Sequence, residues 1–348
     1  EAGADGFLSH APSILPFPLT LRSRITVFTG GTSGKLKAAT RSNGIIQFLP
    51  PLTALIKDIR IHRYASVLIA LPLYHGFGLA TLAVSLFLGK KICLMRHFDA
   101  KEAVNLTDRE RLEVLPVVPA MLSRMMNADD GAGRMKCVKC IISGGDRLER
   151  SLTEKVRDGI GDVLFNLYGT TEAGFFLLAT PADIARNSEV TIGRPIAGVQ
   201  CCVRDKDDDG VGTLWVKSRW AMIGRANRWQ STGDRVCQDA RGYLFHRGRT
   251  DNMVVCGGEN VYPEHVQHVL HEHPDVADAL VFAVDSTAFG KVLNAHVELI
   301  PASTLTSADI RQWLRPRVSR AEMPHDILIT HIDILPTGKR RVTGGVLP

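Results

Sequence analysis

The strongest constraint on the fold of this chain is a repeated pattern of apolar segments that each end in a polar, glycine-containing loop. SVLIALPL leads into YHGFG, CIISGG into an aspartate, and DVLFNLYG into TTEAG. Helical patterns such as FDAKEAVNLTDRE and SLTEKVRDGIG alternate with these segments. Because alternating strands and helices form βαβ units, the pattern predicts an α/β fold with a mainly parallel sheet.

Ligands of open α/β sheets bind outside the carboxyl ends of the strands. Tyr168 offers a flat face for a base, Thr171 a hydroxyl for a phosphate, and Glu172 a hard oxygen ligand for Mg²⁺. We expect one crevice there, shared with the loop at Thr29. A role in a surface turn is the alternative for each residue alone. The predicted set comprises Gly144, Gly145, Asp146, Tyr168, Gly169, Thr170, Thr171 and Glu172.

A second glycine-rich segment, TGGTSGKLK, follows a short β-branched strand at residues 25–27. Its three glycines free backbone N–H groups to wrap an anion, and its hydroxyls and lysine add donors for phosphate oxygens. It is not a Walker loop, because GxxxxGK[ST] is absent. We predict a phosphate loop, with a plain Gly-Ser turn as the alternative. Its residues are Thr29, Gly30, Gly31, Thr32, Ser33, Gly34 and Lys37.

Downstream of Thr191 the sequence changes to short strands separated by tight turns. GVQCCVRD, DDDGVG and TLWVKS are typical of an antiparallel β unit. The unit leads to STGD, whose Asp234 could accept two hydrogen bonds from a ribose diol. A capping or Asx-turn role for Asp234 is the alternative.

The segment RGRTDNMVVCGGENVYPE, residues 247–264, has the composition of a hinge. A polar turn around Arg249 and Asp251 precedes a short apolar strand, the Gly257-Gly258 loop, and a helix entered through Pro263. A flexible joint here would let two parts of one site meet. A β-hairpin with a Gly-Gly turn is equally compatible with the pattern.

Length and composition indicate an ordinary globular protein. The 348 residues suggest two or three domains, with 45% hydrophobic and 22% charged residues. A net charge of +6 permits an anionic ligand such as a nucleotide, but scattered basic residues do not favour nucleic acid.

Seven cysteines, an odd number without regular spacing, indicate free thiols in a reducing compartment, hence a cytoplasmic protein. Cys137 and Cys140 lack the second pair that a zinc ribbon needs, so we expect both on a buried strand.

The start shows no secretory signal. Val67 to Leu88 is apolar, but Pro72 and the glycines near His75 favour a strand, a turn and a buried helix over a membrane span.

Together these motifs resemble one enzyme family. TGGTSGKLK, LPLYHGFG, ISGGD, NLYGTTE, STGD, RGRTDNMVVCGGENVYPEHV and LPTGK occur in the order of the acyl- and aryl-CoA synthetases, the adenylate-forming superfamily. The chain looks closest to the fatty acyl-CoA synthetase branch, over residues 25–343. Leu36 stands where proline is usual in the family.

The resemblance implies a large N-terminal domain and a small mobile α+β C-terminal domain. We expect a leader or linker at 1–24, an adenylation domain at 25–250 that lacks its first part, and the mobile domain at 251–348. Asp251 matches the hinge of the family. Gly257 and Gly258 match the loop of the coenzyme A tunnel.

The resemblance also implies roles for single residues. Tyr168 matches the residue against adenine, Thr171 an α-phosphate contact, and Glu172 the Mg²⁺ carboxylate. Asp234 and Arg249 match the ribose ligands. The remaining matches are Lys339, which reaches the carboxylate and α-phosphate during adenylate formation, and the acyl-pocket residues His75 and Gly174.

The implied activity is that of an ATP-dependent acid–thiol ligase. ATP, Mg²⁺ and coenzyme A are the implied cofactors, and a carboxylic acid, by resemblance a fatty acid, is the substrate. An acyl-AMP ligase that loads an acyl carrier protein is one alternative. A degenerate nucleotide-binding remnant without turnover is another.

Overall fold

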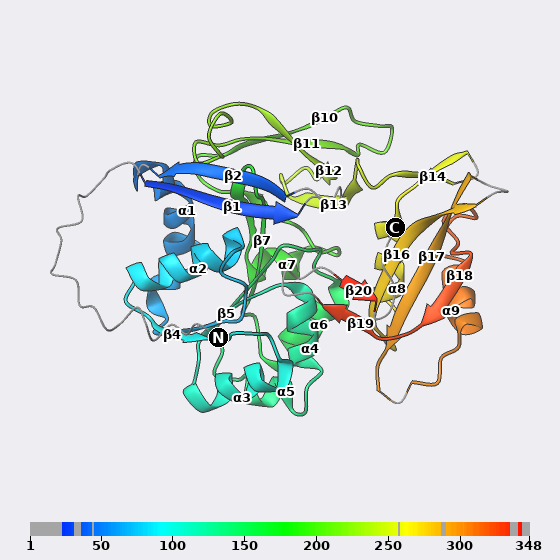
Figure 1. Cartoon of the computed structure of the whole chain (residues 1–348), viewed down its shortest axis with the longest axis horizontal. Coiled ribbons are helices and arrows are strands. Elements are labelled where there is room, and N and C mark those ends of the chain that lie inside the picture. Colours follow the sequence, from blue (N-terminus) through cyan, green and yellow to red (C-terminus); the bar gives the residue numbers. More distant parts are fainter. Residues whose placement is uncertain are drawn as a thin grey trace.

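A seven-stranded sheet forms the centre of the large body of the protein (Figure 1). The computed structural model describes residues 23–30, 36–43, 45–256, 258–286, 290–301, 303–334 and 340–342. In spatial order, the sheet contains β4 (Lys91–Leu94), β3 (Ser66–Ile69), β5 (Val114–Val117), β6 (Cys140–Gly144), β7 (Leu164–Thr170), β8 (Gly174–Ala179) and β9 (Arg194–Pro195).

The sheet is mainly parallel, as predicted. Strands β4, β3, β5, β6 and β7 pair in parallel, and β8 and β9 add antiparallel neighbours at one edge. The parallel strands are short and mostly apolar, and β3, β5 and β6 are buried along their whole length. Such runs occur where helices cover both faces of a parallel sheet.

Alternate residues of these strands enter two different cores. Leu115 and Ile141 pack with helices on one face, whereas Val114 and Ile142 pack with α1 and its neighbours on the other. The helices of the large body are α1 (Ile45–Lys57), the 3₁₀ turn η2 (Ile61–Arg63), α2 (Gly76–Phe87), α3 (Ala100–Glu110), α4 (Pro119–Met126), α5 (Gly131–Arg134), α6 (Arg150–Gly159) and α7 (Pro181–Arg186).

The glycine-rich segment near the start differs from the prediction. β1 (Ser23–Gly30) and β2 (Leu36–Asn43) form an antiparallel pair outside the seven-stranded sheet. Thr29 pairs with Lys37 and Gly30 with Leu36, so these residues lie on strands rather than in a loop. This hairpin is therefore a separate two-stranded unit and not part of the parallel sheet.

Helix α2 is also less buried than expected. Gly78 faces the preceding turn, where an added Cβ would lie 2.4 Å from the carbonyl oxygen of Pro72. Leu86 and Phe87 keep 64% and 73% of their surface exposed. A uniformly apolar helix has no sequence signal for its buried side, which explains the error.

A four-stranded antiparallel sheet follows the central sheet, as predicted from Thr191 onward. It contains β10 (Gln200–Arg204), β11 (Gly212–Lys217), β12 (Gln230–Gln238) and β13 (Leu244–Arg249) in sequence order. Leu214, Val216 and Val236 pack with Phe176 of the central sheet. The two sheets thus share a core, which brings β12 next to β7.

The C-terminal region, residues 254–342, has its own hydrophobic core. Helices α8 (Pro263–His271) and α9 (Ser307–Leu314) pack on β16 (Val276–Ser286), β17 (Gly290–Leu299) and β18 (Asp326–Ile329). The remaining strand pairs are β14 (Val254–Cys256) with β15 (Glu259–Val261), and β19 (Ile332–Ile334) with β20 (Arg340–Val342). The α+β composition predicted for this part is confirmed.

All seven cysteines are free thiols, as expected. Cys140 is buried on β6, and burial raises the pKa of its thiol to about 12. Cys137 lies before that strand and packs with the opposite core, so the prediction of a shared strand is wrong for this residue. Among the described residues, no helix combines the length and apolarity that a membrane span requires.

Candidate active site

A buried carboxylate joins the central sheet to the antiparallel sheet. Asp234 on β12 keeps 5% of its surface exposed. It accepts hydrogen bonds from the hydroxyl of Tyr168 on β7 and from Nη1 of Arg249, the latter at 3.0 Å. Asp234 and Arg249 are directly paired on β12 and β13. The structure thus unites three residues that the sequence predicted for adenine and ribose.

Arg249 extends this network to the expected hinge. Its Nε and Nη2 donate to the two carboxylate oxygens of Asp251, at 2.8 and 2.9 Å. The hydrogen bonds from Arg249 to Asp251, followed by the charges of Asp234 and Asp251, outweigh desolvation and raise the pKa of Arg249. The guanidinium therefore stays charged between two carboxylates.

Tyr168 is held as a neutral hydrogen-bond donor. Burial raises its pKa well above the ordinary value, and the nearby charge of Asp234 raises it further. Its ring packs edge-on against Phe176, with centroids 5.3 Å apart. The hydroxyl therefore donates to Asp234 across the physiological pH range.

The STGD segment positions Asp234 through a local irregularity of β12. The register against β11 shifts within this segment, and the register against β13 shifts just after it, between Arg235 and Val236. Gly233 has a positive φ of 79°, which favours glycine. Thr232 accepts from the backbone N–H of Asp234 at 3.1 Å and donates to the carbonyl of Leu214 at 3.0 Å. The carboxylate of Asp234 thus belongs to the network with Tyr168 and not to an Asx turn.

His246 is a neighbour of Asp234 that sequence reasoning missed. Its Nε2 lies 3.4 Å from Oδ1 of Asp234, and its Nδ1 accepts from the backbone N–H of Gly248 at 3.3 Å. Because an N–H can only donate, Nδ1 of the neutral ring accepts and Nε2 carries the proton toward Asp234. The available signal was its position three residues before Arg249, on the same strand.

The turn that follows Tyr168 carries the predicted phosphate and metal residues. Thr170 pairs with Gly174 across β7 and β8, so Thr171 and Glu172 lie in the tight connection between them. The Thr170 hydroxyl accepts from the backbone N–H of Ala173 at 3.0 Å. Tyr168, Gly169 and Thr170 are strand residues rather than loop residues.

The end of β6 lies against β7, as predicted. An added Cβ on Gly144 would approach the carbonyl oxygen of Leu167 to 2.7 Å and Phe77 of α2 to 3.6 Å. His75, the residue before α2, therefore lies close to this end of β6. Gly145 follows with a φ of 89°, and Asp146 is exposed.

The β1–β2 hairpin lies beside the turn of Glu172. The backbone N–H of Met222 donates to the carbonyl of Glu172 at 2.8 Å, and that of Ile223 donates to the carbonyl of Thr40 on β2 at 2.9 Å. The predicted facing of the phosphate loop and this turn stays a prediction. Its loop residues Gly31, Thr32, Ser33 and Gly34 lie outside the described part of the chain.

Strands β14 and β15 form an antiparallel hairpin in which Cys256 pairs with Glu259, as one of the two interpretations predicted. Gly258 has a φ of 91°, and an added Cβ would meet no atom within 4 Å. Gly257 and Lys339 lie outside the described residues.

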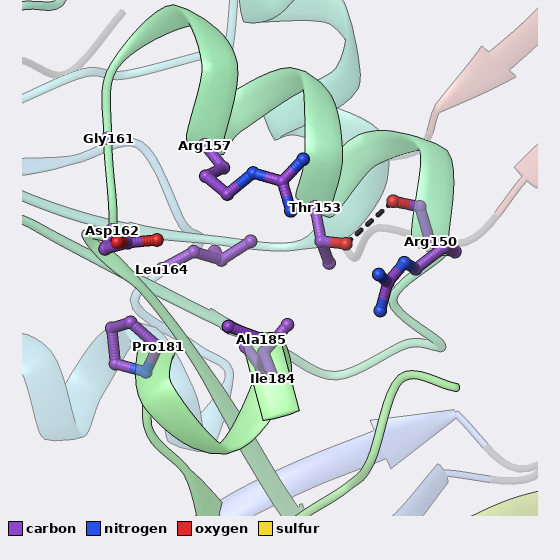
Figure 2. A pocket seen from close by; sticks show the side chains of 9 residues that line it. All are labelled: Arg150, Thr153, Arg157, Gly161, Asp162, Leu164, Pro181, Ile184 and Ala185. Atoms are coloured by element: carbon purple, nitrogen blue, oxygen red, sulfur yellow. Dashed lines mark hydrogen bonds between the residues drawn. The ribbon is translucent and has the colours of Figure 1, made fainter. Parts of the chain in front are cut away.

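Tyr168 does not line either of two hollows on the described surface. One hollow lies between α6 and α7 (Figure 2) and has a volume of about 20 Å³. Its Arg150 is already hydrogen-bonded to Glu154 and to the carbonyl of Asn187. The second has about 450 Å³. It is lined by Asp205, Thr213, Trp215, Ser231, Gly233, Thr250 and Asp251.

No cluster of three or more potential metal ligands occurs among the described residues. Glu172 is partly exposed at its turn. Mg²⁺ commonly takes one or two carboxylates together with substrate phosphates, so a lone carboxylate fits an ion that arrives with a nucleotide.

Comparison with known proteins identifies the family. The AMP-binding enzyme model matches residues 24–224, and the model of the AMP-binding enzyme C-terminal domain matches residues 265–339. A 2-succinylbenzoate–CoA ligase of Bacillus subtilis is 26% identical over 89% of this chain and 65% of its own length. An indoleacetate–CoA ligase of Aromatoleum aromaticum is 29% identical over 89% and 63%. The chain thus spans less than two thirds of these relatives.

Solved structures share the fold. The o-succinylbenzoate CoA synthetase of Bacillus subtilis, in complex with its acyl-adenylate intermediate, is 25% identical and superposes with a TM-score of 0.74. The match covers 90% of this chain and 67% of that one. This chain therefore belongs to the AMP-binding enzymes, the adenylate-forming superfamily that its ordered motifs resemble.

Proposed function

We propose that this protein activates a carboxylic acid with ATP and transfers the acyl group to coenzyme A. A carboxylate oxygen attacks the α-phosphorus and pyrophosphate leaves. The thiol sulfur then attacks the acyl carbon and AMP leaves. The observation that carries this proposal is the network of Tyr168, Asp234 and Arg249 beside the turn of Thr171 and Glu172.

The network suits a nucleoside. Tyr168 presents a ring for adenine, and Asp234 and Arg249 present an acceptor and donors for the ribose hydroxyls. Thr171 would contact the α-phosphate and Glu172 would hold Mg²⁺, which offsets phosphate charge when bound. The other proposed nucleotide contacts are Gly144, Gly145, Asp146, Gly169, Thr170 and the segment from Thr29 to Lys37.

We further propose that the chain divides at Asp251 into an adenylation domain at 25–250 and a mobile domain at 251–348. The turn at Asp251, between β13 and β14, supports this boundary. Lys339 would stabilise the charge that builds during adenylation, and the Gly257-Gly258 turn would leave room for the thiol in the second step.

The acid would bind near His75 and Gly174. The relatives named above are ligases of 2-succinylbenzoate and indoleacetate, so they do not support the prediction that the substrate is a fatty acid. We therefore propose an aromatic carboxylic acid as the substrate class.

A reducing, cytoplasmic setting is supported by the seven free thiols.

Pyrophosphate exchange tests the proposal. Labelled pyrophosphate should enter ATP only when a suitable acid is present, and aromatic acids should surpass fatty acids of similar size. Nucleotide binding without exchange, on the full-length protein and with every acid, would instead favour the degenerate remnant. The rate of thioester formation is then compared between coenzyme A and carrier-bound phosphopantetheine as acceptors. This comparison separates a coenzyme A ligase from a carrier-loading enzyme.

A further inference from the structure

A group of acidic and imidazole side chains joins the large body to the C-terminal region. Glu149, the residue before α6, has a side chain that is only 15% exposed. Its Oε2 is hydrogen-bonded to Nδ1 of His268 on α8, a residue 119 positions away. The hydroxyl of Ser151 adds a contact to the carbonyl of His271 at 3.4 Å. The first turn of α6 therefore lies against α8.

His271 is a second imidazole beside Glu149. Its Nδ1 lies 4.0 Å from Oε1 of Glu149, and its Nε2 lies 2.9 Å from Oδ1 of Asp278 on β16. The other charged groups here are Arg147, 3.7 Å from Glu149, and Glu272, 3.4 Å from Nε2 of His268. Three carboxylates thus surround two imidazoles and one guanidinium.

The charge balance depends on the imidazoles. With both histidines neutral, three carboxylates face the single positive charge of Arg147, whereas protonation of both balances the group. Burial raises the pKa of Glu149, but the hydrogen bond from His268 and the charges of His271 and Arg147 outweigh it and hold this pKa below the ordinary value. While the imidazoles are charged, the carboxylate of Glu149 therefore stays ionised below the ordinary carboxylate range.

A second contact, between α4 and β19, also joins the large body to the C-terminal region. Arg124 on α4 donates to the carbonyl of Ile332 on β19, and its Nη2 lies 4.0 Å from Glu298. Ile334 of β19 pairs with Arg340 of β20, and Lys339 directly precedes β20 in the sequence. Figure 1 shows β19 and β20 on the side of the C-terminal region that faces α6. The observed orientation therefore turns the strand pair next to Lys339 toward the large body.

We propose that Glu149, His268 and His271 form a proton-dependent latch that positions the C-terminal region for adenylate formation. The latch rests on the proposed two-step function and adds three positioning residues to it. One charge-assisted hydrogen bond between His268 and Glu149, together with the charge of His271 at 4.0 Å from Glu149, holds the region docked. Loss of the imidazole protons releases it toward the orientation used for thiol transfer.

The dependence on pH has two limits. The pKa of Glu149 is depressed, so its contribution is present above the ordinary carboxylate range and is lost as the pH falls through that lowered pKa. The second limit is set by the imidazoles, because the latch weakens when a rise in pH removes their protons. The docked population should therefore be smaller at the higher pH than at the lower pH.

A distance measurement tests the latch without any chemistry. A fluorescent donor and acceptor, attached through non-canonical residues at exposed Lys101 and Asp285, report the separation of the two parts. In the protein with an unchanged latch, the docked state gives one characteristic efficiency of energy transfer. The fraction of molecules with that efficiency should be smaller at the higher pH. Glu149→Gln and His268→Gln should each reduce it about tenfold at the lower pH and weaken its pH dependence.

Two further variants separate a latch from a purely structural contact. His268→Arg keeps a permanent positive charge opposite Glu149, so the docked population should persist at the higher pH. His265→Gln is the matched control, because His265 lies on the same helix but pairs with Glu322 inside the C-terminal region, at 2.7 Å. A docked population that ignores pH, or a control that behaves like His268→Gln, would overturn the latch.

Half-reaction rates connect the latch to catalysis. Glu149→Gln should slow pyrophosphate exchange about tenfold while leaving thioester formation from preformed acyl-adenylate unchanged or faster. Equal losses in both steps would refute a positioning role. If no acid supports exchange in any form of the protein, the proposed function fails, whereas the distance measurement still decides whether the latch exists.

Discussion

Asp234 accepts hydrogen bonds from Tyr168 and Arg249 while it is almost completely buried, and this combination makes it sensitive to substitution. Asp234→Ala leaves both donors unmatched, which should lower the free energy of unfolding by about 3 kcal/mol. Urea titration measures this loss. Asp285→Ala, in an exposed pair with Lys291, is the control and should change little.

The same substitution should weaken ATP binding. Asp234→Ala and Arg249→Ala each remove partners of the ribose hydroxyls, and each lost hydrogen bond is worth about 0.5 to 3 kcal/mol. Titration calorimetry on the folded variants measures the affinity. If both variants bind ATP as tightly as the parent, these residues only shape the sheet junction.

Tyr168 should make stability depend on pH in the alkaline range. Its pKa is raised in the folded protein, so its contribution is complete below the ordinary tyrosine pKa and is lost as the pH rises above that value. Tyr168→Phe removes this component. Unfolding free energies measured between about pH 9 and 11 should decline more steeply for the parent than for the variant. Parallel slopes would show that the hydroxyl ionises equally in both states.

Single residues were predictable where they stand in a short motif. Tyr168 and Asp234 occur in NLYGTTE and STGD, and the structure joins them. His246 and Glu149 were missed because their partners are 12 and 119 residues away and neither residue belongs to a short motif.

At the scale of elements, the β7–β8 pair depends on a glycine. An added Cβ on Gly169 would lie 2.4 Å from the carbonyl oxygen of Gly174, so Gly169→Ala must separate the two strands. We expect loss of stability of about 1 to 3 kcal/mol and loss of nucleotide binding, because the turn with Glu172 moves. Gly76→Ala, whose Cβ would meet no atom within 4 Å, is the control. Thermal unfolding and ATP titration compare the two, and equal behaviour would refute this role of Gly169.

Elements with a strong local signal were predicted, and those without one were not. β3, β5 and β6 are continuous apolar runs, and Pro263 begins α8 as expected. The β1–β2 pairing was missed because a glycine-rich segment is compatible with either a hairpin or a loop. Helix α1 contains Pro50 and Pro51, residues that normally argue against a helix.

At the scale of the whole molecule, the proposal requires two orientations of the C-terminal region. Lys339→Ala should slow adenylate formation roughly a hundredfold or more, because its ammonium stabilises charge only in that step. Thioester formation from preformed acyl-adenylate should be spared. Asp251→Pro should do the opposite by restricting rotation, since proline fixes φ near about −65°. Separate assays of the two half-reactions decide, and equal losses for Lys339→Ala would leave the lysine a structural role.

The arrangement of the parts was less predictable than the parts themselves. The motif order indicated a mainly parallel sheet followed by an antiparallel unit, and the structure contains both. Which surfaces meet depends on contacts such as those of Arg124 with Ile332, which join residues 208 positions apart. Side-chain complementarity over such distances leaves no periodic trace in a sequence.

The central claim is that the acid is activated as an acyl-adenylate, and oxygen transfer tests it most directly. The protein is supplied with ATP, coenzyme A and an acid whose carboxylate carries heavy oxygen, and the nucleotide product is analysed by mass spectrometry. Attack of the carboxylate on the α-phosphorus predicts AMP that contains one heavy oxygen in its phosphate, together with unlabelled pyrophosphate. Unlabelled AMP, or ADP with labelled phosphate, would contradict the account.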